Sequence, residues 1–304
     1  MSELDPATGH VIRRIRPGRS RTTCGLSICS AGRHTEPAPV VRRPGVLLSL
    51  NHMRMRIEIE GHPPSAEALW STASAFGHFT AMQVRGGRTR GLELHIRRLE
   101  RANQELFGRA LDGDRVRDLV RHALSDRVDA SVRVYAFESS DDPLVMVTVR
   151  EPGELATPQR LQSVEYQRPD AHLKHLATGQ GYYSRLARSR GFDDALLTAV
   201  DGRISESATA NVGFLDDDGV VWPEGGFLHG ITMQLLERAL PEAGVPSRRA
   251  PIRLSDIPSF RGAFVSNARG VALVSGIDSL RLATDPARVQ AVADVYAAVP
   301  WDPL

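Results

Sequence analysis

Lysine is almost absent from this 304-residue sequence: 37 of its 38 basic residues are arginine, and Lys174 is the exception. Arginine stays protonated at any useful pH, so it cannot serve as a nucleophilic amine. The single lysine therefore either lies at an arbitrary surface position in an arginine-biased sequence or occupies a position that requires an amine able to attack a carbonyl.

Cysteine and long apolar runs are also scarce. Cys24 and Cys29 are the two cysteines, and residues 30–304 contain none. This excludes a disulfide or a thiolate-bound metal ion within residues 30–304. No apolar stretch approaches the roughly 18 residues of a membrane span, and the arginine-rich opening lacks the apolar core of a secretory signal. We therefore expect a cytoplasmic protein without a membrane partner.

The net positive charge of the sequence lies in its N-terminal segment. Residues 1–52 hold eight arginines against Glu3, Asp5 and Glu36, a balance of +5, so the remainder carries −3 of the net +2. A nucleic-acid-binding body should have a basic face of its own, so no nucleic-acid partner is expected. Residues 1–52 also lack hydrophobic periodicity. This predicts a disordered basic tail or an artefact of start-site assignment, since Met53 follows directly.

The pattern of residues 53–158 predicts a small α/β domain. Strands are expected in "RIEIEG", "FGHFTAMQV", "ASVRVYAF" and "LVMVTVR", and amphipathic helices in "RTRGLELHIRRLERANQELFG" and "DGDRVRDLVRHALSD". The polar segment "EPGELATPQR" predicts a linker.

The pattern of residues 159–304 predicts a larger, strand-rich domain. Turn signals separate "FDDALLTAV", "RISESATANVGFL" and "VVWP", which indicates a meander. "GAFVSNARGVALVSGI" favours strands, whereas "GITMQLLERALPEAG" and "PARVQAVADVYAAV" favour helices. Helices and antiparallel strands in two segregated units indicate an α+β fold.

Several residues after Lys174 can carry chemistry. Glu206 lies 32 positions later in "ISESATANVGF", although a lone glutamate on a strand is most often an exposed surface residue. Ile231 and Thr232 open a predicted helix, whose first backbone N–H groups are free to bind an anion.

Two further segments suit an anion. Asn267 and Ala268 end a predicted strand in "VSNARG" and leave backbone donors exposed. "HIRRL" places Arg97 and Arg98 side by side on a helix, so one should point inward and the other into solvent.

An amine, a carboxylate, phosphate donors and an arginine are what pyridoxal 5'-phosphate (PLP) needs. With these residues the sequence resembles the class IV aminotransferases, the fold-type IV PLP enzymes. That family includes branched-chain and D-amino-acid aminotransferases and aminodeoxychorismate lyase. The resemblance runs from "FGHFTAMQV" to "VSGIDS" and rests on "HIRRL", "GFDDALL", "DGRISESATAN", "LHGIT" and "VSNA".

The resemblance implies a role for each candidate. Lys174 matches the Schiff-base lysine, and Glu206 matches the carboxylate that binds the pyridinium nitrogen. The cofactor's phosphate would be bound by Arg98, by the helix start at Ile231 and Thr232, and by the loop at Asn267 and Ala268. Asn211 matches an asparagine that we expect to be structural.

The sequence also departs from the family pattern. Ser207 replaces a glycine, His229 a proline, Met233 an arginine, and Gln83 an arginine that often ends the early strand. No tyrosine lies five residues after Lys174, and Tyr182 or Tyr183 is the candidate substitute. The residues expected to bind the cofactor are thus present, while those expected to face the substrate differ from the family pattern.

The leading hypothesis is a PLP-dependent aminotransferase that moves an amino group between an amino acid and a keto acid. The resemblance also implies a homodimer with sites near the subunit interface. One alternative is a PLP lyase similar to 4-amino-4-deoxychorismate lyase, which "SNA" and "GHFTAMQV" favour. Another is a binding protein that keeps the fold without turnover.

Overall fold

The computed structural model describes residues 3–4, 11–12, 55–73, 76–139, 142–282 and 284–304. Residues 1–48 and 49–304 are two compact units. In the first unit, β1 (Glu3–Leu4) and β2 (Val11–Ile12) pair antiparallel. The rest of the predicted tail, with both cysteines, lies outside the described residues.

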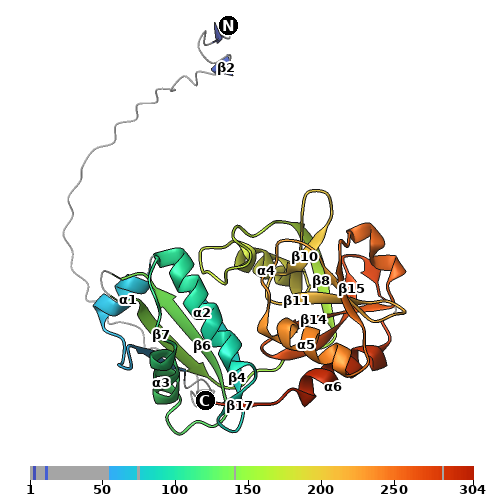
Figure 1. Ribbon diagram of the computed structural model, residues 1–304. Coiled ribbons are helices and arrows are strands. Elements are labelled where there is room, and N and C mark those ends of the chain that lie inside the picture. Colours follow the sequence, from blue (N-terminus) through green and yellow to red (C-terminus); the bar gives the residue numbers. More distant parts are fainter. Residues whose placement is uncertain (1–2, 5–10, 13–54, 74–75, 140–141, 283) are drawn as a thin grey trace, which may run out of the picture. The chain divides into compact units, whose positions relative to one another are not determined.

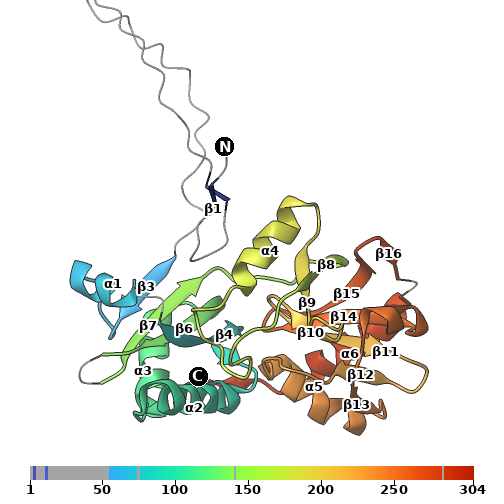
Figure 2. The ribbon, with the colours of Figure 1, turned by 90° about the horizontal axis from the view of Figure 1, so that it is seen from above.

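A four-stranded antiparallel sheet organises residues 56–150, in the strand order β3-β7-β6-β4. Helices α2 and α3 pack on one face of this sheet (Figures 1 and 2). The elements are β3 (Arg56–Ile59), α1 (Ala66–Thr72), β4 (Gly77–Val84), β5 (Arg88–Thr89), α2 (Leu92–Phe107), α3 (Gly113–Leu124), β6 (Ala130–Phe137) and β7 (Leu144–Arg150).

The helices begin and end where local chemistry dictates. Gly108 follows α2 with a left-handed φ of 65° and donates its N–H to the Gln104 carbonyl, which ends the helix as predicted. The Asp112 carboxylate accepts from two backbone N–H groups in the first turn of α3 and caps that helix.

A nine-stranded sheet organises residues 159–281, with β16 beside β15 and the other strands in the order β10-β9-β8-β15-β14-β11-β12-β13. The elements are β8 (Gln159–Glu165), α4 (Gln180–Ser189), β9 (Asp194–Thr198), β10 (Ile204–Ser207), β11 (Asn211–Leu215), β12 (Val220–Pro223), α5 (Ile231–Glu242), β13 (Ser247–Ala250), η1 (Leu254–Ser259), β14 (Gly262–Asn267), β15 (Gly270–Ile277), β16 (Leu280–Arg281) and α6 (Pro286–Ala298).

The second sheet corrects two expectations. β8 pairs parallel with both β9 and β15, and β12 pairs parallel with β13, so the strands are not all antiparallel. The expected meander also breaks after β10, because β11 pairs with β12 and β14 instead. Helix α4 was not predicted, and β8 begins inside the expected linker.

Each sheet has its own hydrophobic core. Leu99 is fully buried against the first sheet, and Trp222, Leu236 and Phe264 are fully buried against the second. The boundary between residues 158 and 159 stays a prediction, because residues 49–304 form one compact unit.

The C-terminal segment belongs to a separate two-stranded sheet. β17 (Asp302–Pro303) pairs antiparallel with β5. The Arg90 guanidinium lies 3.9 Å from the centre of the Trp301 ring and donates to the carbonyls of Ala297 and Val299. These contacts connect the end of the chain to the segment that leads into α2.

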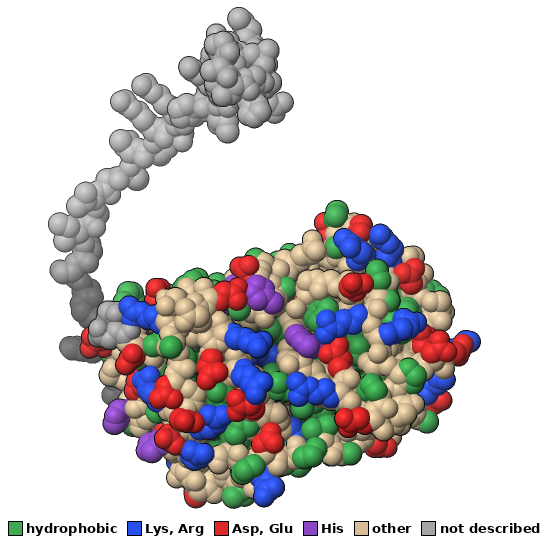
Figure 3. Space-filling model, viewed as in Figure 1, with side chains coloured by type: hydrophobic (Ala, Val, Ile, Leu, Met, Phe, Trp, Pro, Cys, Tyr) green, Lys and Arg blue, Asp and Glu red, His purple; other side chains and the backbone are tan. Residues whose placement is uncertain are grey.

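The described surface is mixed in charge, and none of the described helices is both long and apolar enough to cross a membrane. Figure 3 shows basic and acidic side chains interspersed over one face.

Replacing Leu236 by alanine tests the core beneath α5. Leu236 is fully buried, so the lost contacts and the remaining cavity should lower the free energy of unfolding by about 2–5 kcal/mol. The control is Leu69→Ala on α1, where the side chain is 45% exposed and the loss should stay within about 0.5 kcal/mol. Urea titration measures both, and equal losses would contradict the described core.

Candidate active site

A cavity of about 1230 Å³ brings the predicted site residues together. Its wall contains all seven of them: Arg98, Lys174, Glu206, Ile231, Thr232, Asn267 and Ala268. They come from α2, the segment before α4, β10, the start of α5 and the end of β14. Residues far apart in the sequence therefore converge on one space.

Lys174 is held by the edge strand of the first sheet. The Phe79 N–H in β4 donates to the Lys174 carbonyl at 2.9 Å, and the Leu176 N–H donates to the Gly77 carbonyl at 2.8 Å. The lysine Nζ lies 4.8 Å from the centre of the Phe79 ring. The backbone on either side of the lysine is thus fixed against β4, and the side chain lies over the Phe79 ring.

The surroundings of Lys174 favour a neutral amine. Removal from water, together with the positive charges of Arg98 and Arg168, lowers the pKa of Lys174 to about 7, although Glu206 acts in the opposite direction. A pKa near 7 leaves about half of the amines neutral at neutral pH, whereas an ordinary lysine with a pKa of about 10.4 has roughly one neutral amine in 2500. This lysine can therefore act as a nucleophile or a base.

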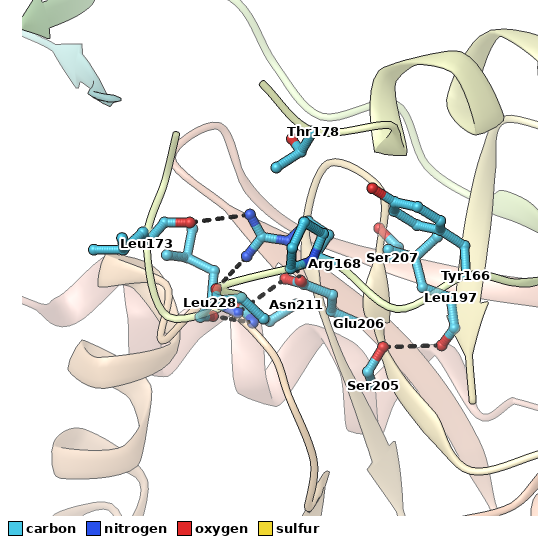
Figure 4. Close-up of polar contacts among 12 residues, drawn as sticks. Tyr166, Arg168, Leu173, Thr178, Leu197, Ser205, Glu206, Ser207, Asn211 and Leu228 are labelled. Atoms are coloured by element: carbon cyan, nitrogen blue, oxygen red, sulfur yellow. Dashed lines mark hydrogen bonds and ion pairs between the residues drawn. The ribbon is translucent and has the colours of Figure 1, made fainter. Parts of the chain in front are cut away.

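Glu206 is one partner of a buried ion pair (Figure 4). Its Oε1 lies 2.8 Å from the Nε of Arg168, and its Oε2 accepts from the Leu228 N–H at 3.2 Å. Both charged residues are buried. Burial raises the pKa of Glu206, while Arg168 and the Leu228 N–H oppose that rise. Glu206 is therefore not an exposed strand residue.

Sequence reasoning missed Arg168. Its guanidinium also donates to the carbonyls of Ala171 and Leu173, just before Lys174, and so connects the lysine segment to Glu206. Nothing in the sequence distinguishes this arginine from the other 36.

Asn211 supports the same loop from β11. Its Nδ2 donates to the Leu228 carbonyl at 2.7 Å, while the Leu228 N–H binds Glu206. A Cβ at Gly230 would lie 2.0 Å from Asn211 Oδ1, so the close approach requires glycine there. Asn211 thus has the structural contacts that we expected.

The start of α5 is open to an anion. Its N-cap, Gly230, makes no side-chain capping bond, so the first backbone N–H groups of the 12-residue helix keep their capacity to bind. The Thr232 hydroxyl donates to the Asn267 carbonyl at 2.8 Å, which joins the helix start to the end of β14.

Arg98 points inward and Arg97 outward, as expected for the pair. Arg98 Nη2 donates to the His229 carbonyl at 2.6 Å, just before α5, whereas Arg97 is exposed beside Glu93. Burial and the charge of Arg168 lower the pKa of Arg98 to about 10, so it remains a cation at neutral pH.

These groups fit PLP. The wall offers an amine, a carboxylate, a cation and an open helix start, which match the cofactor's carbonyl, pyridinium and phosphate. The buried Ser266 hydroxyl in the same wall has no hydrogen-bond partner among the described residues, so capacity for a polar ligand remains.

The four residues that depart from the family pattern lie in different parts of the structure. Ser207 is buried and donates to Asp194 Oδ2 at 3.0 Å, and Met233 belongs to the core under α5. The His229 side chain binds Glu237 at 2.6 Å, and Gln83 lies in the cavity wall.

Tyr182 and Tyr183 do not take the place of the missing tyrosine, because neither of them lies in the cavity wall. Tyr182 is 65% exposed, and Tyr183 packs on the Tyr166 ring at 4.8 Å between centres. Gly179, five residues after Lys174, instead donates its N–H to the Tyr166 hydroxyl at 2.7 Å.

The sequence matches the family model of amino-transferase class IV over residues 77–277. This chain therefore belongs to the class IV aminotransferases. PLP is the cofactor of that family, so the expected family and cofactor are confirmed.

Curated relatives match a shorter stretch. A Rickettsia felis protein named "Probable branched-chain-amino-acid aminotransferase" is 36% identical over 98 residues, covering 32% of this chain and 33% of that protein. A Rickettsia conorii protein of the same name is 35% identical over 98 residues, covering 32% of this chain and 33% of that protein. The chain thus spans about a third of the length of the curated relatives it matches.

Solved structures share the fold. The branched-chain aminotransferase of the archaeon Thermoproteus uzoniensis, solved with norvaline, has a TM-score of 0.70 at 19% identity, covering 80% of this chain and 93% of that one. A hypothetical aminotransferase from Mycobacterium tuberculosis in its PLP-bound form has a TM-score of 0.68 at 20% identity, and the match covers 80% of this chain and 98% of that one. A Legionella pneumophila protein assigned as 4-amino-4-deoxychorismate lyase has a TM-score of 0.66 at 17% identity, and the match covers 74% of this chain and 91% of that one. The predicted fold-type IV α+β architecture is confirmed.

The titration of Lys174 tests the electrostatics of the cavity. Its pKa is lowered to about 7, and the neutral amine is the reactive form. In protein freed of PLP, the rate of dinitrophenylation at Lys174 should therefore rise through pH 7 and level off above it, instead of climbing towards about pH 10.4. Peptide mass spectrometry separates this site from the N-terminal amine, and a midpoint near 10 would contradict the described burial.

Proposed function

We propose that this protein is a PLP-dependent aminotransferase that moves an amino group between an amino acid and a keto acid. The observation that carries the proposal is the position of Lys174. It is the single lysine of the chain, its pKa is lowered to about 7, and it shares a cavity with Glu206 and an anion-binding helix start.

The residues of the cavity would divide the work. PLP, when bound, supplies a carbonyl that takes up amino groups and a ring that withdraws electrons from the substrate Cα. Lys174 Nζ would hold the cofactor and move the Cα proton. Glu206, oriented by Arg168, would keep the proton on the ring nitrogen.

A second set of residues in the cavity wall would bind the phosphate group of PLP. Arg98 would supply a fixed cation, and the N–H groups of Ile231 and Thr232 would supply the helix start. Asn267 and Ala268 would complete this part of the wall.

Lyase chemistry is the second candidate. Lys174, Glu206 and the phosphate donors would serve elimination equally well, and the lyase-assigned Legionella protein has a similar fold. Product analysis separates the two. Amination of an added keto acid supports transfer, whereas an elimination product without such amination supports the lyase. A cytoplasmic homodimer is part of the proposal: the homodimer follows from the family resemblance, and the cytoplasmic location follows from the composition of the sequence.

Two substitutions should fail in different ways. Lys174→Arg keeps the positive charge but cannot give up a proton at neutral pH, so it should bind PLP only non-covalently and lose turnover. Glu206→Gln keeps a hydrogen-bonding side chain without the charge, so it should keep covalent PLP and lose rate by about 100-fold or more.

Steady-state rates and visible absorbance of both purified variants measure the two effects. Wild-type turnover by Glu206→Gln, beside an inactive Lys174→Arg, would contradict the role of Glu206.

A further inference from the structure

The segment between β12 and α5 contacts two charged residues of the cavity wall. The Leu228 N–H donates to Glu206 Oε2 at 3.2 Å, and the Leu228 carbonyl accepts from Asn211 at 2.7 Å (Figure 4). The carbonyl of the next residue, His229, accepts from Arg98 Nη2 at 2.6 Å. The backbone of two consecutive residues therefore helps to position both the carboxylate proposed for the ring nitrogen and the arginine proposed for the phosphate.

Arg98 depends on the His229 carbonyl for its orientation. An arginine side chain has several rotatable bonds, and fixing them costs conformational entropy. Within the described part of the chain, the Arg98 guanidinium has this carbonyl as its hydrogen-bond acceptor and has no ion-pair partner. The Gln234 side chain donates to the same carbonyl at 2.9 Å. A displacement of residue 229 would therefore displace the guanidinium as well.

The His229 side chain is bonded outside the cavity. Leu228 and Gly230, the residues on either side of it, belong to the cavity wall, whereas His229 does not. Its Nε2 lies 2.6 Å from Glu237 Oε2, in the second turn of α5. A carboxylate only accepts hydrogen bonds, so Nε2 carries the proton and donates. The imidazole thus ties the backbone of residue 229 to the helix that follows it.

Glu237 is in turn held by Arg249 in β13. Arg249 Nε donates to Glu237 Oε1 at 2.9 Å, Nη2 donates to Oε2 at 3.2 Å, and the guanidinium lies 5.3 Å from the centre of the Phe227 ring. Burial favours the neutral carboxyl, but the hydrogen bonds from His229 and Arg249 outweigh this effect and lower the pKa of Glu237. The carboxylate is therefore charged at neutral pH and is fixed by α5 and β13 together.

Residue 229 is a proline in the family pattern and a histidine in this chain. A proline ring restricts φ of its own residue, so it limits the backbone without any side-chain contact. A histidine leaves φ free unless its side chain is bonded to another part of the structure. The bond from His229 to Glu237 can supply the restriction that a proline would otherwise give.

We propose that His229 is a positioning residue for Arg98: its side chain, bonded to Glu237, fixes the carbonyl that holds this arginine at the phosphate end of the cavity. The contact takes over the backbone restriction that a proline would provide. The inference rests on the proposed function, because the phosphate role of Arg98 is part of that proposal. It adds that the affinity for PLP depends on a side chain that lies outside the cavity wall.

Two ligands that differ by one phosphate group test this role without requiring turnover. Full-length protein freed of PLP is titrated with PLP and with pyridoxal, and visible absorbance follows binding at Lys174. His229→Ala removes a hydrogen bond to a charged group at a side chain that is 46% exposed, so it should weaken PLP binding by about three- to tenfold. Pyridoxal binding should not change, since pyridoxal has no phosphate for Arg98.

Three further variants separate positioning from a general loss of structure. His229→Pro should bind PLP as tightly as the wild type, because the proline ring restricts the backbone directly. Glu237→Ala should weaken PLP binding in the wild type but not in the His229→Pro background. His122→Ala is the matched control, because it removes a 2.8 Å contact to Glu58 outside the cavity wall. The control should leave both affinities unchanged.

Three results would overturn the role of His229: unchanged PLP affinity in His229→Ala, an equal loss of PLP and pyridoxal, and a His229→Pro variant as weak as His229→Ala. Arg98→Ala shows which proposal has failed. A selective loss of PLP in Arg98→Ala, with none in His229→Ala, refutes the positioning role and leaves the proposed function in place. An Arg98→Ala variant that keeps the wild-type preference for PLP over pyridoxal refutes the proposed phosphate role, and the positioning role with it.

Discussion

The backbone hydrogen bonds between β4 and the residues around Lys174 fix the amine to which the rest of the site is arranged. The sheet that holds the lysine also supports α2, which brings Arg98 into the cavity. The larger sheet brings Glu206, and Arg168 connects that carboxylate to the carbonyls just before the lysine. The lowered pKa of Lys174 arises because these separate elements converge.

An arginine-rich composition gives this site fixed charges. Arg98 has a pKa lowered to about 10, so it remains a cation at neutral pH. His95, in the same wall, has a pKa lowered to about 3 by burial and by the charges of Arg98 and Lys174, so it remains neutral. Lys174 can therefore change its charge near pH 7 while these neighbours keep theirs.

Much of the fold and site could be predicted, because local patterns carry that information. The C-terminal end of α2 and the start of α5 follow from glycine positions, and Lys174 is distinguished by composition alone. The parallel pairing of β8 could not be predicted, since apolar runs do not reveal strand direction. Arg168 has the same residue type as 36 others, and the positions of Tyr182 and Tyr183 depend on α4, which was not predicted.

Borohydride reduction after incubation with PLP tests the central claim most directly, namely that Lys174 is the amine that bonds the cofactor. Because the chain has one lysine, the modified peptide identifies the site without ambiguity. The account predicts a phosphopyridoxyl mass on the peptide that contains Lys174, and none on the same region of Lys174→Arg. A cofactor mass confined to the N-terminal amine, or no fixed cofactor at all, would contradict it.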